Sequence, residues 1–217
     1  MGCRVKLAHV AAAMVLAACA PREQPSVAHD TIATARASAA ASHVTVEGIV
    51  SVPSGVIDAG FAITDGEAGI HVAADSTTRF AAGERVRVTG TRNDVHGLAS
   101  VRPERVERLG TGTLPPPKPV RTGKVGEATE GWMVRVSGRA VTAVTSDLPY
   151  GYKLWVDDGS GRVQIFFPAS AGDFGLDRVR VGATVTATGF SGQYDSTYEV
   201  LPATRADLAV SEDSPKP

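Results

Sequence analysis

Residues 154–166 read Leu-Trp-Val-Asp-Asp-Gly-Ser-Gly-Arg-Val-Gln-Ile-Phe, which is two alternating runs on either side of a turn sequence. Apolar and polar residues alternate on both sides of Asp157–Gly161, which is the pattern of strands with one buried and one outer face. Asp-Gly and Ser-Gly are turn sequences, so the two alternating runs predict an antiparallel β-hairpin. The side chains expected to point into the protein are those of Leu154, Val156, Val163 and Ile165.

The same pattern occurs earlier in the chain, and the two copies define a tandem repeat. Asp65-Gly66 and the apolar residues after it match Asp158-Gly159, and residues 83–90 match residues 182–189. Three positions recur 99 residues later: Gly90, Val101 and Pro103 as Gly189, Val200 and Pro202. Five short strands in each copy, with glycine at the curved points, predict two small closed β-barrels.

The repeat sets the domain organisation. The first copy spans residues 43–110 and the second spans residues 120–210. We expect a Pro-rich linker over residues 111–119 to separate them, and we expect residues 211–217 to be a disordered tail. No long amphipathic helical pattern follows the signal, so the predicted fold class is all-β.

The chain begins with an export-signal pattern over residues 1–18. Arg4 and Lys6 precede an apolar run over residues 7–18, and about twelve residues are too few to cross a ~30 Å hydrocarbon core. The run ends Leu-Ala-Ala-Cys19, which resembles the lipobox of bacterial lipoproteins. A plain secretory signal is one alternative. N-myristoylation at Gly2 is another, although Lys6 stands where that motif has Ser or Thr.

The lipobox resemblance implies that the signal is removed before Cys19 and that Cys19 is lipidated. In the lipoproteins of didermal bacteria, Asp after the cysteine favours retention in the inner membrane; here Ala20 follows. The expected location is therefore the outer membrane of the cell envelope, facing either the periplasm or the surface. Residues 19–42 are small and polar, and we expect a flexible tether there, with an Ala-rich helix over Thr31–Ser42 as the alternative.

The repeat also resembles a known family of modules. The order V-x-V-x-G, L-x-V-D-D-G-S-G-x-V-x-I-F, V-G-x-x-V-x-x-x-G and Y-E-V is similar to the OB-folds that stand in tandem beside bacterial extracellular nucleases and in exported lipoproteins. The resemblance implies two tandem OB-fold-like five-stranded barrels. OB-folds commonly bind single-stranded nucleic acid or oligosaccharide through strands 2 and 3 and the adjoining loops, while others only pack against proteins.

Strand alternation predicts a binding face on the second copy. Its outward residues on strands 2 and 3 are Lys153, Trp155, Arg162, Gln164 and Phe166, and the nearby loops add Tyr150, Tyr152 and Tyr194. Aromatic rings beside cationic groups suit base stacking and phosphate contact. The alternative is that Trp155 and Phe166 are packed against the first domain or the linker as an internal interface.

The same face of the first copy holds few such side chains. Its outward residues would be Ala62, Thr64, His71 and Ala73, with His71 as an ordinary polar surface residue. We therefore expect the second copy to bind a ligand and the first to space or brace it. The net charge is −1, so binding to nucleic acid should be modest and sensitive to salt.

The residues of the two repeats predict that the protein is not an enzyme. Both cysteines, Cys3 and Cys19, precede the repeats, which excludes a thiol nucleophile or a Cys-based zinc site within them. Asp157–Gly161 is better explained as a β-turn than as a calcium loop. We predict a lipid-anchored, non-catalytic envelope protein without cofactor or metal. Its partner would be single-stranded nucleic acid or, alternatively, an envelope protein or oligosaccharide on the same aromatic face.

Overall fold

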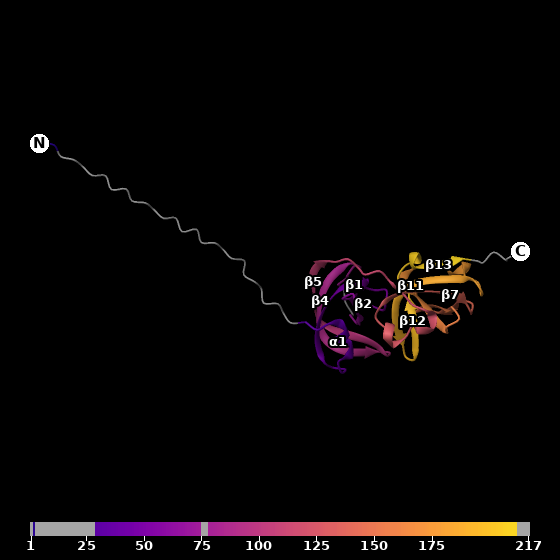
Figure 1. Ribbon diagram of the computed structural model, residues 1–217, viewed down its shortest axis with the longest axis horizontal. Helices are drawn as coiled ribbons and strands as arrows, with labels where there is room; N and C mark the ends of the chain where they lie inside the picture. The colour runs from indigo at the N-terminus through magenta and orange to yellow at the C-terminus, as the bar shows by residue number, and fades with distance from the viewer. Residues whose placement is uncertain (1, 3–28, 75–77, 212–217) are drawn as a thin grey trace.

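The computed structural model of the chain describes residues 2, 29–74 and 78–211, and it shows two β-barrels side by side (Figure 1). The first barrel is drawn in indigo to magenta and the second in orange to yellow. Apart from residue 2, the signal segment lies outside the described residues, as do Cys19 and residues 212–217. In the described part of the chain, no helix is both long and apolar enough to span a membrane.

Five strands form the first barrel. They pair in the order β1-β2-β3-β5-β4, and β4 pairs with β1 to close the ring. β3 and β5 are parallel and the other neighbours are antiparallel. This is the strand order of an OB-fold. The strands are β1 (His43–Val52), β2 (Phe61–Thr64), β3 (Gly69–Val72), β4 (Glu84–Val95) and β5 (Leu98–Thr111).

The second barrel repeats this order as β7-β9-β10-β12-β11, closed by pairing of β11 with β7. β10 and β12 are its parallel pair. The chain therefore folds as two tandem OB-fold-like barrels, which confirms the predicted fold class. Its strands are β7 (Met133–Ala140), β9 (Gly151–Asp157), β10 (Arg162–Pro168), β11 (Thr184–Tyr194) and β12 (Thr197–Leu201).

Short elements complete the two barrels. Strands at the margin of the second barrel are β6 (Lys118–Pro119), β8 (Thr145–Asp147) and β13 (Leu208–Ser211). Single 3₁₀ turns are η1 (Thr122–Lys124), η2 (Glu127–Thr129), η3 (Ala169–Ala171), η4 (Leu176–Arg178) and η5 (Arg205–Asp207). The Pro-rich segment thus ends in a two-residue strand that pairs in parallel with β7.

The hairpin of β9 and β10 buries the four side chains that were predicted to point inward. Val163 pairs with Val156 and Ile165 pairs with Leu154, and all four side chains are buried in the core of the second barrel. The Asp157 carboxylate accepts hydrogen bonds from the amides of Gly159 (2.7 Å) and Gly161 (3.2 Å), which holds the turn. The apolar residues of the two alternating runs therefore point into the core, and the polar residues between them point to the outer face.

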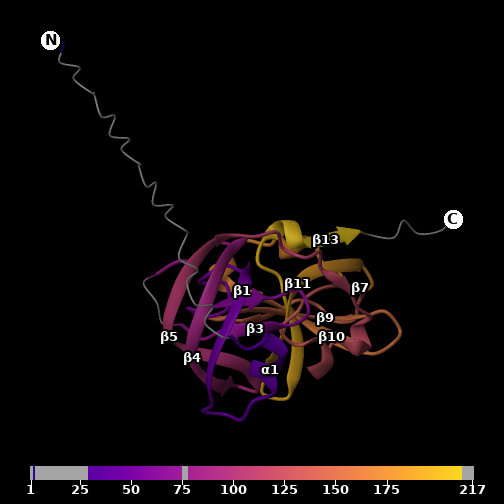
Figure 2. The same ribbon diagram turned by 60° about the vertical axis from the view of Figure 1, so that its left-hand side comes forward.

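Residues 30–42 differ from the expected flexible tether. Helix α1 (Ile32–Ala37) packs against the first barrel beside β1 and β3 (Figure 2). Ile32 and Ala35 are fully buried, Thr31 caps the helix, and the Ile32 amide donates to Asp65 Oδ2 at 3.0 Å. The structure thus has a short helix within the Thr31–Ser42 range of the alternative. Two buried apolar residues are too few to stabilise it alone, and the barrel surface stabilises it instead.

We expect Ile32→Ala to lower the free energy of unfolding of the full chain by about 2 kcal/mol, because it leaves a cavity beneath α1. Urea denaturation followed by circular dichroism measures the change. Leu109→Ala is the control, since Leu109 is partly exposed on β5 of the same barrel. Equal effects of the two substitutions would contradict the docking of α1.

An apolar cluster joins the two barrels, and we call it the interbarrel cluster. From the first barrel it contains Val52, Val56, Ile57, Ala62 and Leu98, and from the second Met133, Phe166, Phe190 and Leu201. Elsewhere the hairpin tips of the barrels meet. His96 and Asp195, which are 99 residues apart in the repeat, form a 3.2 Å contact, and the Asp195 amide donates to the His96 carbonyl.

Candidate binding face of the second barrel

Three side chains form a row across the outer face of the second barrel. Trp155 on β9 lies opposite Gln164 on β10, and Gln164 lies beside Glu199 on β12. Neighbouring strands are about 4.8 Å apart, so the three side chains are direct neighbours. The strand register places Trp155 and Gln164 on one face, and it adds Glu199, which the pattern of strands 2 and 3 alone did not include.

Gln164 and Glu199 are buried partners. Each is 7% exposed, and Gln164 Nε2 donates to Glu199 Oε2 at 2.6 Å. Burial raises the pKa of Glu199 to about 7, and this effect exceeds the opposing effects of the Gln164 hydrogen bond and the Lys153 ammonium. This polar pair stabilises the face internally, and in this arrangement Gln164 is not free to contact a ligand.

Trp155 and Arg162 remain at the surface beside that pair. Trp155 is half-buried, Arg162 is exposed, and the Arg162 guanidinium lies 4.5 Å from the centroid of the indole ring. The Trp155 amide donates to Thr142 Oγ1, which fixes the strand at this position. A cation over an indole face contributes roughly 0.5–1 kcal/mol at an exposed site. This contact orders the pair, but it is weak enough for another ring to replace Arg162 on the indole.

Lys153 lies next along β9 and is engaged with an acidic neighbour. Its ammonium is 2.7 Å from Asp147 Oδ2, and both side chains are partly exposed. An exposed ion pair of this kind contributes little to stability, so Lys153 can turn toward a phosphate at small cost. We call Trp155, Arg162 and Lys153 the open half of the face.

Phe166 faces the first barrel. It is half-buried, packs against the interbarrel cluster, and its Cζ would be 3.0 Å from a Cβ added at Gly151. Close to it, Ser170 Oγ donates to the Val56 carbonyl at 3.2 Å. We call Gln164, Phe166 and Glu199 the covered half of the face. The predicted stacking pair of Trp155 and Phe166 is thus divided between an open and a covered half.

The three tyrosines of the predicted site lie in different environments. Tyr150 is 72% exposed in the loop before β9, whereas Tyr152 is partly buried against the core of the second barrel. Tyr194 lies at the tip of the β11–β12 hairpin, where its ring stacks on His96 with centroids 4.5 Å apart. Tyr194 therefore takes part in the contact between barrels although it is 55% exposed, and Tyr150 has the most exposed side chain of the three.

The corresponding face of the first barrel is buried rather than bare. His71, predicted to be a surface residue, is 2% exposed, and its Nδ1 is 3.1 Å from Ser100 Oγ. Burial lowers the pKa of His71 to about 4, so its ring is neutral at pH 7. That prediction was wrong because β2 and β3 face the second barrel and the loop over residues 53–60, which the sequence pattern could not place.

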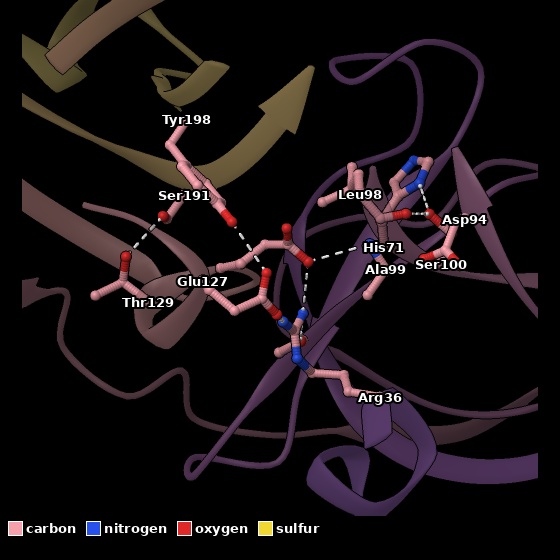
Figure 3. Close-up of polar contacts among 12 residues, drawn as sticks. Arg36, His71, Asp94, Leu98, Ala99, Ser100, Glu127, Thr129, Ser191 and Tyr198 are labelled. Carbon is pink, nitrogen blue, oxygen red and sulfur yellow. Dashed lines mark hydrogen bonds and ion pairs between the residues drawn. The ribbon is translucent and has the colours of Figure 1, made fainter. Parts of the chain in front are cut away.

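Polar contacts also cross between the barrels (Figure 3). Arg36 of α1 lies 3.1 Å from Glu130 and 3.5 Å from Glu127, and Glu130 Oε1 accepts from the Ala99 amide at 3.1 Å. Tyr198 donates to Glu127 Oε2 at 3.0 Å. The helix that was expected to be a tether thus links the first barrel to the segment that enters the second.

A cleft of about 460 Å³ lies along this seam, lined by Arg36, Arg92, Glu127, Glu130 and Trp132 among others. Its charged side chains are largely paired with one another, as Arg36 is with the two glutamates and Arg92 is with Asp94. Burial raises the pKa of Glu130. Among the residues that the structure describes, no cluster of His, Cys, Asp and Glu side chains has the arrangement of a metal site.

No protein-family model matches the chain, and no curated protein sequence matches it. Among solved structures, the chain is similar to an OBody, an OB-fold scaffold, in the structure "OBody AM1L10 bound to hen egg-white lysozyme". The match has 16% identity and a TM-score of 0.37, and it covers 46% of this chain and all of the OBody. The OB-fold assignment of each barrel comes from its own strand order. OB-fold domains commonly bind nucleic acids or other ligands.

Proposed function

We propose that this chain is a binding protein whose second barrel takes a short stretch of single-stranded nucleic acid on its open half. The observation that carries the proposal is the Arg162 guanidinium over the half-exposed ring of Trp155, on the strand face that OB-folds use. A base can stack on the indole while Arg162 and Lys153 contact phosphates. Stacking on one ring contributes roughly 1–3 kcal/mol, so the expected affinity is weak.

A protein or oligosaccharide partner is the second candidate, and the exposed apolar side chains near the open half favour it. Tyr150 and Leu148 are exposed in the loop before β9. Val141, whose amide donates to the Trp155 carbonyl, is 44% exposed. An apolar protein contact responds little to salt, whereas phosphate contacts weaken steeply as salt rises. Salt dependence therefore separates the two candidates.

We expect Trp155→Ala to weaken binding of oligo-dT by the full chain about tenfold or more, because the stacking surface is lost. The anisotropy of a fluorescein-labelled oligonucleotide is the measurement, since its signal does not depend on the tryptophan removed. Arg162→Gln should lower the slope of log affinity against log salt by about one.

Arg105→Gln is the control, because it removes the same charge from an exposed arginine that lies on β5 of the first barrel and not on the open half. It should leave both the affinity and the salt slope unchanged. Wild-type binding that shows no salt dependence, or that survives Trp155→Ala, would rule out the nucleic-acid proposal in favour of the apolar partner.

We also propose that Cys19 is lipidated and anchors the protein in the outer membrane, a proposal that rests on the lipobox resemblance of residues 16–19. Each buried methylene of an acyl chain contributes about 0.8 kcal/mol, so several chains on one residue anchor a protein firmly. Cys19→Ser should move the protein from the membrane fraction of a didermal bacterium to the soluble fraction and abolish labelling by a radioactive fatty acid. Cys3→Ser is the matched control and should change neither; equal labelling of both variants would exclude lipidation at Cys19.

A further inference from the structure

The loop over residues 53–60, between β1 and β2 of the first barrel, lies against the second barrel. Val56 and Ile57 of this loop belong to the interbarrel cluster together with Phe166, Phe190 and Leu201. Ser170 Oγ adds a hydrogen bond to the Val56 carbonyl. In an OB-fold this loop flanks the binding face of its own barrel. Here it reaches the face of the neighbouring barrel.

The loop has a defined shape that belongs to the first barrel. The Gly55 amide donates to the Gly60 carbonyl, the Gly60 amide donates to the Ile57 carbonyl, and Asp58 has a φ of 51°. Ser54 exchanges hydrogen bonds with the backbone of Phe80 through its amide and its Oγ. Because these bonds are within the first barrel, the loop moves with that barrel as a preformed unit.

The position of the loop limits what the face can bind. The open half offers one stacking ring, Trp155, and the next ring along the face, Phe166, is packed against the cluster that contains Ile57. A strand of several nucleotides needs successive rings or a continuous groove. It therefore cannot extend from Trp155 across Phe166 unless Val56 and Ile57 move away.

We infer that the first barrel is a gate for the second: the loop over residues 53–60 occludes the covered half, and a longer single strand binds there only when the two barrels separate. This inference rests on the proposed function of the open half. In the closed form the chain binds a short oligonucleotide at Trp155 and Arg162. In the open form Phe166 becomes a second stacking ring, so affinity for a longer strand rises.

Two substitutions at different contacts test the gate in the full chain. Ile57→Ser weakens the apolar packing of the loop, and Gly131→Ala blocks the close approach of the two barrels at a separate point. Leu109→Ser is the control, because it removes a partly exposed apolar side chain from the first barrel outside the cluster. Labelled oligo-dT of about four and about fifteen nucleotides are the probes, within the range of OB-fold site sizes.

Two amides are bonded across the barrels, that of Ala99 to Glu130 Oε1 and that of Asp195 to the His96 carbonyl, so amide hydrogen exchange read by mass spectrometry on peptides that hold them reports opening without any ligand. Faster exchange at these two amides, with peptides from β9 unchanged, shows that the barrels separate while the second barrel stays folded. With opening, both variants should bind the longer oligonucleotide about tenfold more tightly and the shorter one with unchanged affinity, because apparent affinity scales with the fraction of competent molecules.

The possible results distinguish the gate from the proposed function. A gain for the long oligonucleotide in both variants, and not in the control, supports the gate. Equal binding by wild type and opened variants overturns the gate and leaves the proposed function standing. Absence of binding by every variant, although exchange shows opening, overturns the proposed function and the gate with it. Unchanged exchange in both variants shows that the loop does not hold the barrels together and overturns the gate alone.

Discussion

Replacing Gly131 by alanine should separate the two barrels and lower the stability of the full chain by about 3 kcal/mol or more. Gly131 has a φ of 86°, and a Cβ added to it would lie 2.1 Å from the Gly69 carbonyl oxygen. A Cβ on Gly69 would in turn lie 1.8 Å from the Gly131 carbonyl oxygen. Both obstructing atoms are backbone, so side-chain rearrangement cannot relieve the overlap. The barrels must move apart and expose part of the interbarrel cluster.

Gly159→Ala is the matched control for this prediction. Gly159 has a φ of 89°, close to that of Gly131, but a Cβ at this position meets no atom within 4 Å. Its cost should therefore be the backbone strain alone, about 1 kcal/mol. Differential scanning calorimetry should show a much larger fall in the thermal midpoint for Gly131→Ala. Similar falls in the two variants would mean that the contact of Gly69 with Gly131 does not hold the barrels together.

The fold could be predicted because the strands and turns of each barrel follow from residues that are close together in the sequence. Leu154, Val156, Val163 and Ile165 alternate with polar residues, and turn sequences separate the runs, so neighbouring residues decide which face is buried. The repeat then carried the same prediction to the first copy. Helix α1 was only the alternative to a flexible tether, because its two buried residues, Ile32 and Ala35, are stabilised by a surface that the remote strands β1 and β3 provide.

The candidate site was predictable only in part, for a related reason. Strand alternation shows that the side chains of Trp155, Gln164 and Phe166 point away from the core of the second barrel. A side chain that points away from its own core can still be buried by a neighbouring barrel. Whether an outward face meets water depends on how the two barrels dock, and docking rests on residues such as Ile57 and Gly131 that carry no periodic pattern. The burial of His71 has the same cause.

The docked pair combines symmetric and asymmetric contacts. His96 and Asp195 occupy equivalent places in the two copies, both with φ near 50°, and they meet as equivalent residues do across the axis of an isologous dimer. The loop over residues 53–60 breaks this symmetry, since only the first copy inserts such a loop into the interbarrel cluster. Duplication thus yields one barrel with a partly open face and another whose corresponding face is used for docking.

Glu199→Gln should make the protein more stable than wild type at pH 8, by up to about 3 kcal/mol, and equally stable near pH 4. Burial raises the pKa of Glu199 from its ordinary value of 4.5 to about 7 in the folded protein. The folded state therefore holds a proton that the unfolded state releases. Its contribution to stability is complete below pH 4.5 and is lost as the pH rises to about 7. Glutamine keeps an oxygen that can accept the Gln164 hydrogen bond and never ionises.

The difference in unfolding free energy between variant and wild type separates the titration of Glu199 from that of other groups. The charged groups that act on it are Lys153 on β9, Asp147 on β8 and Asp58 in the loop of the first barrel. His71 has its pKa lowered by burial, so it weakens the folded state as the pH falls from 6.5 to 4, in both proteins alike. The difference between the urea unfolding free energies of variant and wild type should thus rise from pH 4.5 to pH 7 and then level off. Glu67→Gln is the control, because Glu67 is exposed on the first barrel, and its difference from wild type should not rise in this way. A flat difference for Glu199→Gln would mean that its carboxylate is solvated and that the covered half of the face is open to water, which would also remove the physical basis of the gate.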